Sequence, residues 1–192
     1  MSTKLRSTFA ILALALASVP VGAAAADKAK SEQAAKGSLA KDDARYFERL
    51  AQANMAELET GKPAQSKAVS DEVKKYAAQM VQDHGKMLDE QKSMAAAKGI
   101  TMPSAPVKSH QSDLKKLQEQ SGQTFDRSYM TQMVKDHGDT LKLVQDIADK
   151  ARDPDLKAAG QKAVPEVRNH LEMAKRLASN TQRPEKASGP KK

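Results

Sequence analysis

Four polar side chains of types that bind metal ions fall at matching places in long stretches of predicted helix. They are Glu57, His84, His137 and His170. Neutral imidazoles are ligands for Zn, Cu, Fe or Ni, and a carboxylate adds negative charge beside the ion. If the helices pack together at this level, the four side chains form a core site for one divalent metal ion.

Two of the histidines belong to an internal repeat. Residues 79–85 read QMVQDHG and residues 132–138 read QMVKDHG, so six of the seven positions are identical. In each copy an aspartate, Asp83 or Asp136, directly precedes the histidine and lies about 100° around the helix from it. These aspartates are candidates for hydrogen-bonding partners of metal-bound histidines or for ligands of a second ion.

Methionine and glycine residues accompany the repeated histidines. Met80 and Met87 flank His84 at helical spacing, and thioethers suit copper(I), although methionine more commonly fills irregular cores. Gly85 and Gly138 follow the two histidines. Because a glycine inside a helix costs about 1 kcal/mol relative to alanine, the pair predicts a close helix approach or room for a bound group.

The pattern does not fit a di-iron oxidase. That site takes a glutamate three residues before a histidine on each of two helices. Val81 and Val134 occupy those positions here, and Glu166 precedes His170 by four residues. Glu166 is still a further candidate ligand, one turn from His170. Since no catalytic triad, phosphate loop or dinucleotide fingerprint is found either, the sequence favours a binding protein over an enzyme.

A purely structural interpretation of the same residues stays open. Buried histidine and glutamate side chains can hydrogen-bond to one another and so set the register of a helical bundle. In that case the polar layer would bind no ion.

The elements that must position these residues are helices. Alanine, lysine, glutamine and leucine are abundant, and no strand-like alternation occurs. We expect long helices over about 42–61 (or on to 69, past Pro63), 71–98, 124–150 and 154–179. A short helix at about 108–120 lies in the long connection 100–123. Ser70, Gly99 and the pair Asp153-Pro154 provide stop and start signals.

Each long helix has a face with alternating four- and three-residue spacing, which is typical of helices that pack in a bundle. The faces are Phe47, Leu50, Asn54 and Glu57; Val73, Ala77, Met80, His84, Met87, Gln91 and Met94; Met130, Met133, His137, Thr140, Val144 and Ile147; and Leu156, Gly160, Ala163, Val167, His170, Ala174 and Leu177. Counted from the turns near Ser70 and Arg152 at about 1.5 Å per residue, the four metal-type residues fall within about 5 Å of one level.

The predicted fold is therefore all-α. Short links make two antiparallel helical hairpins, and the long connection with its short extra helix is a crossover that sets the second and third long helices parallel. This is a ferritin-like four-helix bundle.

The chain ends predict export. Lys4 and Arg6 precede an apolar run at 9–17 and small residues at 19–26, which is the pattern of a secretory signal peptide cleaved near Ala26. We expect a signal peptide at 1–26, a flexible leader at 27–40, the helical domain at 41–179 and a disordered basic tail at 180–192. The expected location is the periplasm or the extracellular space, with no membrane span in the mature chain.

Charge and composition narrow the choice of partners. The net charge is +8, there is no cysteine, and the chain has only 3 Tyr, 3 Phe and no Trp. Thiolate chemistry is excluded, and a nucleic-acid surface with interleaved aromatics is not expected. An envelope protein or an anionic surface remains a possible partner of the basic chain.

With these features in place, the chain resembles domain-of-unknown-function family 4142, a group of small exported bacterial proteins often labelled predicted outer membrane proteins. The segments that carry the resemblance are NMAELETGK (54–62), VKKYAAQMVQDHGKMLDE (73–90), FDRSYMTQMVKDHGDTL (125–141) and VPEVRNHLEMAK (164–175). The resemblance implies a ferritin-like bundle outside the cytoplasm and no defined reaction. It points to Glu57, Asp83, His84, Asp136, His137 and His170 as motif residues, while Pro63 departs from the pattern.

Two functions of different class follow from the sequence. The first is an exported bundle that binds a divalent metal through Glu57, His84, His137 and His170. The second is a structural or interaction protein of the cell envelope that has no ligand.

Overall fold

The computed structural model describes residues 39–182, in which all regular secondary structure is α-helical and no strand occurs. The helices are α2 (Lys41–Lys67), α3 (Asp71–Lys98), α4 (Lys108–Gln118), α5 (Gly122–Lys150) and α6 (Pro154–Thr181). The all-α class predicted from composition is confirmed. The predicted signal peptide, nearly all of the leader and most of the predicted tail lie outside the described residues.

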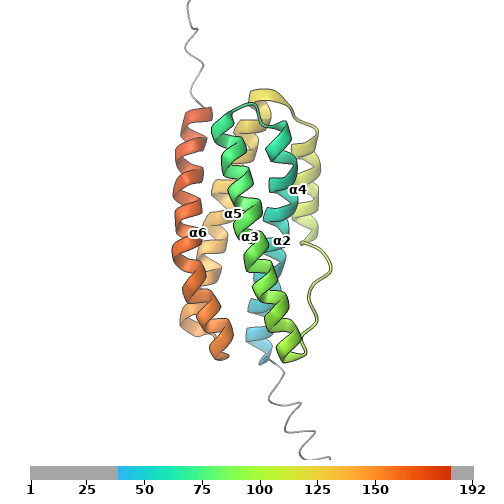
Figure 1. The fold of residues 1–192 in the computed structure, drawn as a ribbon, viewed down its shortest axis with the longest axis vertical. Coiled ribbons are helices and arrows are strands. Elements are labelled where there is room, and N and C mark those ends of the chain that lie inside the picture. The colour runs from blue at the N-terminus through green and yellow to red at the C-terminus, as the bar shows by residue number, and fades with distance from the viewer. Residues whose placement is uncertain (1–38, 183–192) are drawn as a thin grey trace, which may run out of the picture. The chain divides into compact units, whose positions relative to one another are not determined.

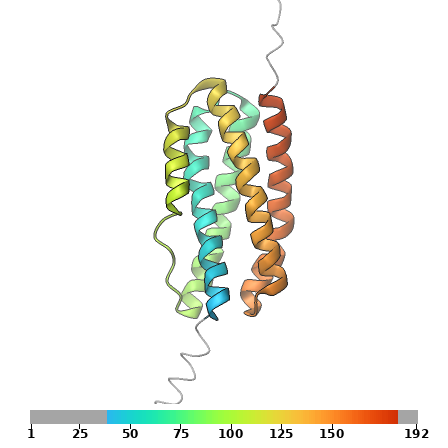
Figure 2. The ribbon, with the colours of Figure 1, turned by 180° about the vertical axis from the view of Figure 1, so that it is seen from behind.

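The four long helices lie side by side (Figure 1). α2 pairs with α3 and α5 pairs with α6, each as an antiparallel hairpin, and smaller contacts of α2 with α5 and of α3 with α6 join the two hairpins. The connection after α3 runs back along the helices and contains α4, which packs on α2 and α5 (Figure 2). As a result, α3 and α5 run in the same direction.

The helix ends follow local signals in the sequence. Gly99 ends α3 in the left-handed conformation at φ 63°, which favours glycine. The Asp153 side chain accepts hydrogen bonds from the backbone N–H groups of Asp155 and Leu156, and Pro154 occupies the first turn of α6. Of the two predicted ends for α2 the later is right, because the helix passes Pro63 and ends at Lys67.

The core consists of two apolar clusters separated by a polar layer. One cluster contains Ala64, Ala68, Val73, Tyr76, Ala77, Met80, Leu117, Phe125, Tyr129, Met130, Met133, Ala174, Leu177 and Ala178. The other contains Phe47, Leu50, Ala95, Leu143, Val144, Ile147, Ala151, Leu156, Ala163 and Val167. Along each long helix the buried histidine or glutamate falls between members of the two clusters.

The predicted inner faces are buried with two exceptions. Met87 and Met94 are only half-buried, whereas their neighbours Leu88 and Ala95 are buried. The physical reason is that a straight α-helix has 3.6 residues per turn, so a face assigned with a 3.5-residue period drifts away from the core along a long helix. These two methionines are therefore not core residues.

The close helix approaches predicted at Gly85 and Gly138 are wrong. A Cβ atom on Gly138 would meet no atom within 4 Å, and one on Gly85 would meet only Leu58 Cδ2 at 3.8 Å. The tightest contact is at Gly160, where a Cβ atom would lie 2.7 Å from the backbone nitrogen of Ala148; one on Gly61 would lie 2.9 Å from Val81 Cγ2. Gly160 thus allows α6 to approach α5 closely.

Two buried aspartates, which the sequence analysis did not single out, hold the turns between paired helices. Asp43 in the first turn of α2 accepts hydrogen bonds from the backbone N–H groups of Arg152 (3.1 Å) and Asp153 (2.8 Å) in the α5–α6 turn. Asp126 near the start of α5 does the same for Val69 (3.1 Å) and Ser70 (2.8 Å) in the α2–α3 turn. Each hairpin is therefore tied at its turn by a side chain from the other hairpin.

None of the helices within residues 39–182 combines the length and the apolar character needed to cross a membrane.

We predict that Asp43→Ala lowers the free energy of unfolding by about 2–3 kcal/mol, because it leaves partly buried N–H groups without an acceptor. The matched control is Asp42→Ala, in the same turn but exposed and paired with Arg45; its effect should stay below about 1 kcal/mol. Urea denaturation of both variants measures the difference. Equal losses in the two variants would show that the tie to the α5–α6 turn contributes nothing.

A glycine pair gives a second prediction. Gly138→Ala should stabilise the metal-free protein by about 0.5–1 kcal/mol, because alanine restricts the unfolded chain and its methyl group meets open space. Gly160→Ala should destabilise it by about 1–3 kcal/mol through overpacking against Ile147 and Ala148. Thermal melting of the two variants side by side checks the opposite signs; a shift in the same direction would contradict the packing argument.

Candidate metal centre

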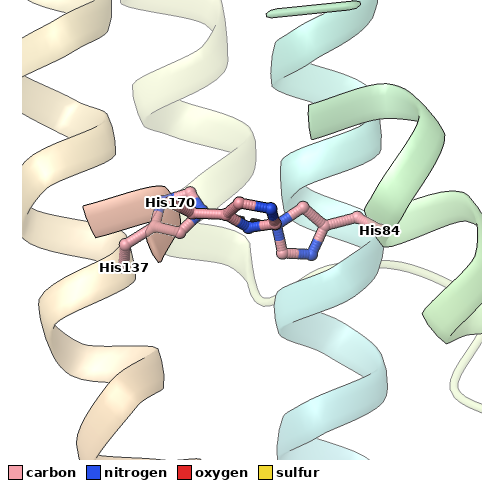
Figure 3. Close-up of side chains that lie close together, drawn as sticks. All are labelled: His84, His137 and His170. Carbon is pink, nitrogen blue, oxygen red and sulfur yellow. Dashed lines mark hydrogen bonds between the residues drawn. The ribbon is translucent and has the colours of Figure 1, made fainter. Parts of the chain in front are cut away.

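Three histidines from three helices meet in the polar layer between the two apolar clusters (Figure 3). His84 comes from α3, His137 from α5 and His170 from α6, and all three are almost fully buried. Their ring centroids lie 5.4–5.5 Å apart. One ring nitrogen of each lies within 4.8 Å of those of the other two, so the three can offer nitrogen ligands to one point.

The ring nitrogens that point away from this meeting place each face an acceptor. Nδ1 of His84 lies 2.9 Å from Asn54 Oδ1, and Nδ1 of His137 lies 3.0 Å from the carbonyl oxygen of Met133. Nε2 of His170 lies 3.2 Å from Asp83 Oδ2. Oxygen acceptors on the outer nitrogens place the ring protons there, which leaves the other nitrogen of each ring with its lone pair.

The inner nitrogens are short of hydrogen-bond partners. Nε2 of His84 lies 3.3 Å from Nε2 of His137, and with both ring protons on the outer nitrogens no proton lies between them. Nδ1 of His170 is buried and has no partner within residues 39–182. Buried polar atoms are normally satisfied. This cluster therefore differs from a self-sufficient hydrogen-bonded layer.

Glu57 lies beside the three histidines but not among their inner nitrogens. Its Oε1 is 3.6 Å from Nδ1 of His137, on the outer side of that ring. Its Oε2 is buried and has no hydrogen-bond partner in the described part of the chain. Burial raises the pKa of Glu57 well above its ordinary value, and the charge of Asp136 raises it further. The predicted four-residue layer therefore consists of three converging histidines and an adjacent carboxyl group.

The remaining predicted site residues take separate positions. Asp83 accepts a hydrogen bond from Nε2 of His170, and its predicted role beside a metal-bound histidine stays a prediction. Asp136 faces away from the histidines, toward Lys135 (Nζ at 3.3 Å) and His110 (Nδ1 at 3.9 Å). Glu166 is exposed. The reason in the case of Asp136 is helical geometry: a residue next to an inward-facing histidine points about 100° away from it.

Sequence reasoning missed three buried polar residues, of which Asn54 and Tyr76 contact the cluster. Asn54 was placed on the inner face of α2 without a role, yet it orients His84. Tyr76 reaches the backbone oxygen of His170 at 3.5 Å, and its ring meets that of His137 edge-on. Tyr129 is fully buried with no hydroxyl partner among residues 39–182. Tyrosines on an inner face carry no sequence signal that separates them from ordinary core aromatics.

Burial keeps all three imidazoles uncharged. Burial lowers the pKa of His84 well below its ordinary value, and His137 and His170 lower it further. Burial and the neighbouring His170 lower the pKa of His137 to about 3, against the opposing effect of the Met133 carbonyl. Burial lowers the pKa of His170 too, although Asp83 favours its charged form. Neutral imidazole is the form that binds metal ions.

These shifts predict how stability depends on pH. The pKa of His137 is lower in the folded than in the unfolded chain, so its contribution is present above about pH 6.5 and is lost as pH falls toward 3. Between pH 6 and pH 5, metal-free wild type should lose about 1 kcal/mol more unfolding free energy than His137→Gln.

Urea denaturation of both proteins at the two pH values, with a chelator present, measures this difference. Glu57, whose pKa is raised, has the opposite pH dependence and is present in both proteins, so the comparison isolates the histidine. Parallel losses would contradict a buried neutral His137.

Comparison with solved structures supports the fold. A crystal structure of a DUF305 fragment from Deinococcus radiodurans is similar, with a TM-score of 0.67 over 74% of this chain and 98% of that chain. The two sequences are 12% identical, so the likeness concerns the fold alone. The search of curated proteins found no match.

Comparison with protein families covers most of the chain. The sequence model of a domain of unknown function, DUF4142, matches residues 28–177. That range includes α2 to α5 and most of α6, and with it all three histidines. The chain belongs to the DUF4142 family.

Proposed function

We propose that this protein binds a single divalent metal ion between α3, α5 and α6 through His84, His137 and His170, and that it acts as a binding protein rather than an enzyme. The observation that carries the proposal is the set of three inward nitrogens. Their rings place protons on the outer nitrogens, while Nε2 of His84 and Nε2 of His137 face each other without a donor and Nδ1 of His170 has no partner within residues 39–182. A cation at their centre would accept all three lone pairs.

The spacing of one pair of ring nitrogens supports this proposal. Two nitrogens bound to one ion at about 2.05 Å and at the tetrahedral angle lie about 3.3 Å apart. Nε2 of His84 and Nε2 of His137 are separated by 3.3 Å. The outer contacts also match known metal sites, in which each ligating histidine donates its other N–H group to a carboxylate or carbonyl oxygen.

Three neutral imidazoles suit Zn, Cu, Fe or Ni. The nearest carboxyl group is that of Glu57, whose free Oε2 lies in the same layer. In the proposed complex Glu57 supplies compensating negative charge, either as a fourth ligand after a side-chain rotation or through the ring of His137. Asp83 keeps His170 in place.

The architecture and location proposed with this function are those of an exported ferritin-like bundle. The parallel course of α3 and α5, joined by a connection that contains α4, is what a single long crossover in such a bundle requires. The export signal proposed at residues 1–26 would deliver the protein to the periplasm or beyond.

A ligand-free envelope protein is the second candidate. The bonds of His84 to Asn54 and of His170 to Asp83 favour it, because they already satisfy part of the polar layer without an ion. In that case the layer would only set the helix register, and the net charge of +8, which becomes +6 when Lys4 and Arg6 are removed with residues 1–26, would favour an acidic envelope partner.

Metal-dependent melting of residues 27–192 separates the two candidates. After removal of metal, the protein is melted with Zn, Cu, Ni, Fe(II) or Mn in turn. An ion at about 100 times its Kd adds about 2.7 kcal/mol, so one metal should raise Tm by roughly 5–10 °C. The stoichiometry measured by calorimetry should be one ion per chain.

Two variants control this experiment. His84→Ala/His137→Ala should lose the shift, and His110→Ala, which removes a histidine of α4 outside the cluster, should keep it. The proposal fails if no metal raises Tm, or if the double variant responds as the wild type does.

A further inference from the structure

A cavity that none of the three histidines lines opens at the surface between α3 and α6. Its volume is about 260 Å³, just below the range of about 300–1,000 Å³ for drug-sized ligands. It exists because α3 and α6 pack loosely at this level, with small residues such as Ala159 and Ala163 facing it from α6. A molecule smaller than a typical drug would fill it.

The walls of this cavity are mainly apolar. Leu50 of α2, Met87 and Met94 of α3, and Ala163 of α6 contribute to them. The two methionines are the residues that the helix periodicity turns away from the core, and they remain half-buried here. Methionine side chains adapt to ligands of different shape, so the walls suit an aliphatic body.

At its inner end the cavity meets a chain of hydrogen bonds with a defined direction. Nδ1 of His84 donates to Asn54 Oδ1 (2.9 Å), and Asn54 Nδ2 donates to Gln91 Oε1 (2.7 Å). The amide nitrogen of Gln91 is thereby left as the terminal donor. This nitrogen is buried and has no acceptor within the described residues. The Gln91 residue as a whole is 4% exposed and lines the cavity.

Because the unpaired group is a donor, the missing partner is an acceptor. An unsatisfied buried amide N–H costs about 1–3 kcal/mol, and nothing else lining the cavity meets it in residues 39–182. Nε2 is closed to solvent, so a small shift of the Gln91 side chain toward the cavity must open it; an oxygen on the ligand, at the end of an apolar body, would then complete the chain that begins at His84.

The charged residues around the mouth of the cavity, its rim, disfavour the binding of anions. Glu90, Asp155 and Glu166 lie around the cavity with a single cation, Lys162, which pairs with Glu90. Asp155 pairs with Lys98 at 2.7 Å, so Glu166 is the carboxylate of this rim that is left without an ion pair among residues 39–182. The negative charge at the rim of the cavity repels a carboxylate or phosphate ligand, whereas a neutral ligand is not repelled.

We propose that the cavity between α3 and α6 binds a small neutral amphiphile, an aliphatic molecule whose carbonyl or amide oxygen accepts a hydrogen bond from Gln91 Nε2. The aliphatic part lies against Met87 and Met94. This site takes a different ligand from the histidine cluster and does not require a metal ion there.

The test uses hexanamide as the probe, with hexanoate of the same length as its anionic counterpart. Metal-free residues 27–192 carrying ¹³C-methyl methionine are titrated and followed by NMR. Hexanamide should shift the Met87 and Met94 methyl signals saturably and leave Met173, in the opposite core cluster, unchanged. Hexanoate should bind at least about tenfold more weakly.

Two variants locate the site. Gln91→Leu should weaken hexanamide binding about fivefold, the effect of losing one hydrogen bond, whereas Gln82→Leu, an exposed position on the same helix, should not change it. Ala159→Leu, which keeps Gln91 but fills the cavity, should abolish the methyl shifts. Melting curves confirm that each variant is folded.

The proposal is overturned if hexanamide leaves both methionine signals unmoved up to its solubility limit. It is also overturned if hexanoate binds equally well, or if Gln91→Leu and Ala159→Leu both bind hexanamide as the wild type does. All titrations are made without metal, so these results do not depend on whether the histidine cluster binds an ion.

Discussion

The structure depends on the burial of three uncharged imidazoles at the centre of an otherwise apolar core. Desolvation keeps His84 and His137 neutral, and neutral rings have only one proton each to share between two nitrogens. Because every ring uses its proton on an outer oxygen acceptor, the inner nitrogens are left facing one another. Such an arrangement is unfavourable unless something supplies positive charge between them.

The surrounding fold prevents the layer from relaxing. Apolar clusters lie on both sides of it along the helices, and Gly160 lets α6 approach α5 closely. Asp43 and Asp126 tie each helical hairpin to the turn of the other, at opposite ends. Helix register is thereby set at both ends, and the histidines meet at the middle. Stability and a pre-formed nitrogen cluster thus come from the same packing.

The contacts around the cluster differ from one helix to the next. The interface of α5 with α6 is extensive, whereas that of α3 with α6 is small and leaves a cavity beside Gln91. The Gln91–Asn54–His84 chain joins that cavity to the histidine cluster through buried amide groups. In a low-dielectric interior such bonds are strong when complete and costly when one donor is left over. Within residues 39–182, the free donor of Gln91 and the free oxygen of Glu57 are further groups on α2 and α3 where the polar layer remains incomplete.

The sequence by itself determined the helices, their main boundaries and the inward direction of the three histidines, because helix propensity, capping residues and apolar periodicity are local properties. It also placed Glu57 and the histidines at one level by counting residues from the turns. Only the tertiary structure decided that Glu57 lies outside the nitrogen cluster and Asn54 supports it, that Asp43 and Asp126 bond to distant turns, and that α6 approaches α5 at Gly160. These outcomes depend on the rotation and spacing of one helix against another, which arise from the packing of side chains far apart in the chain.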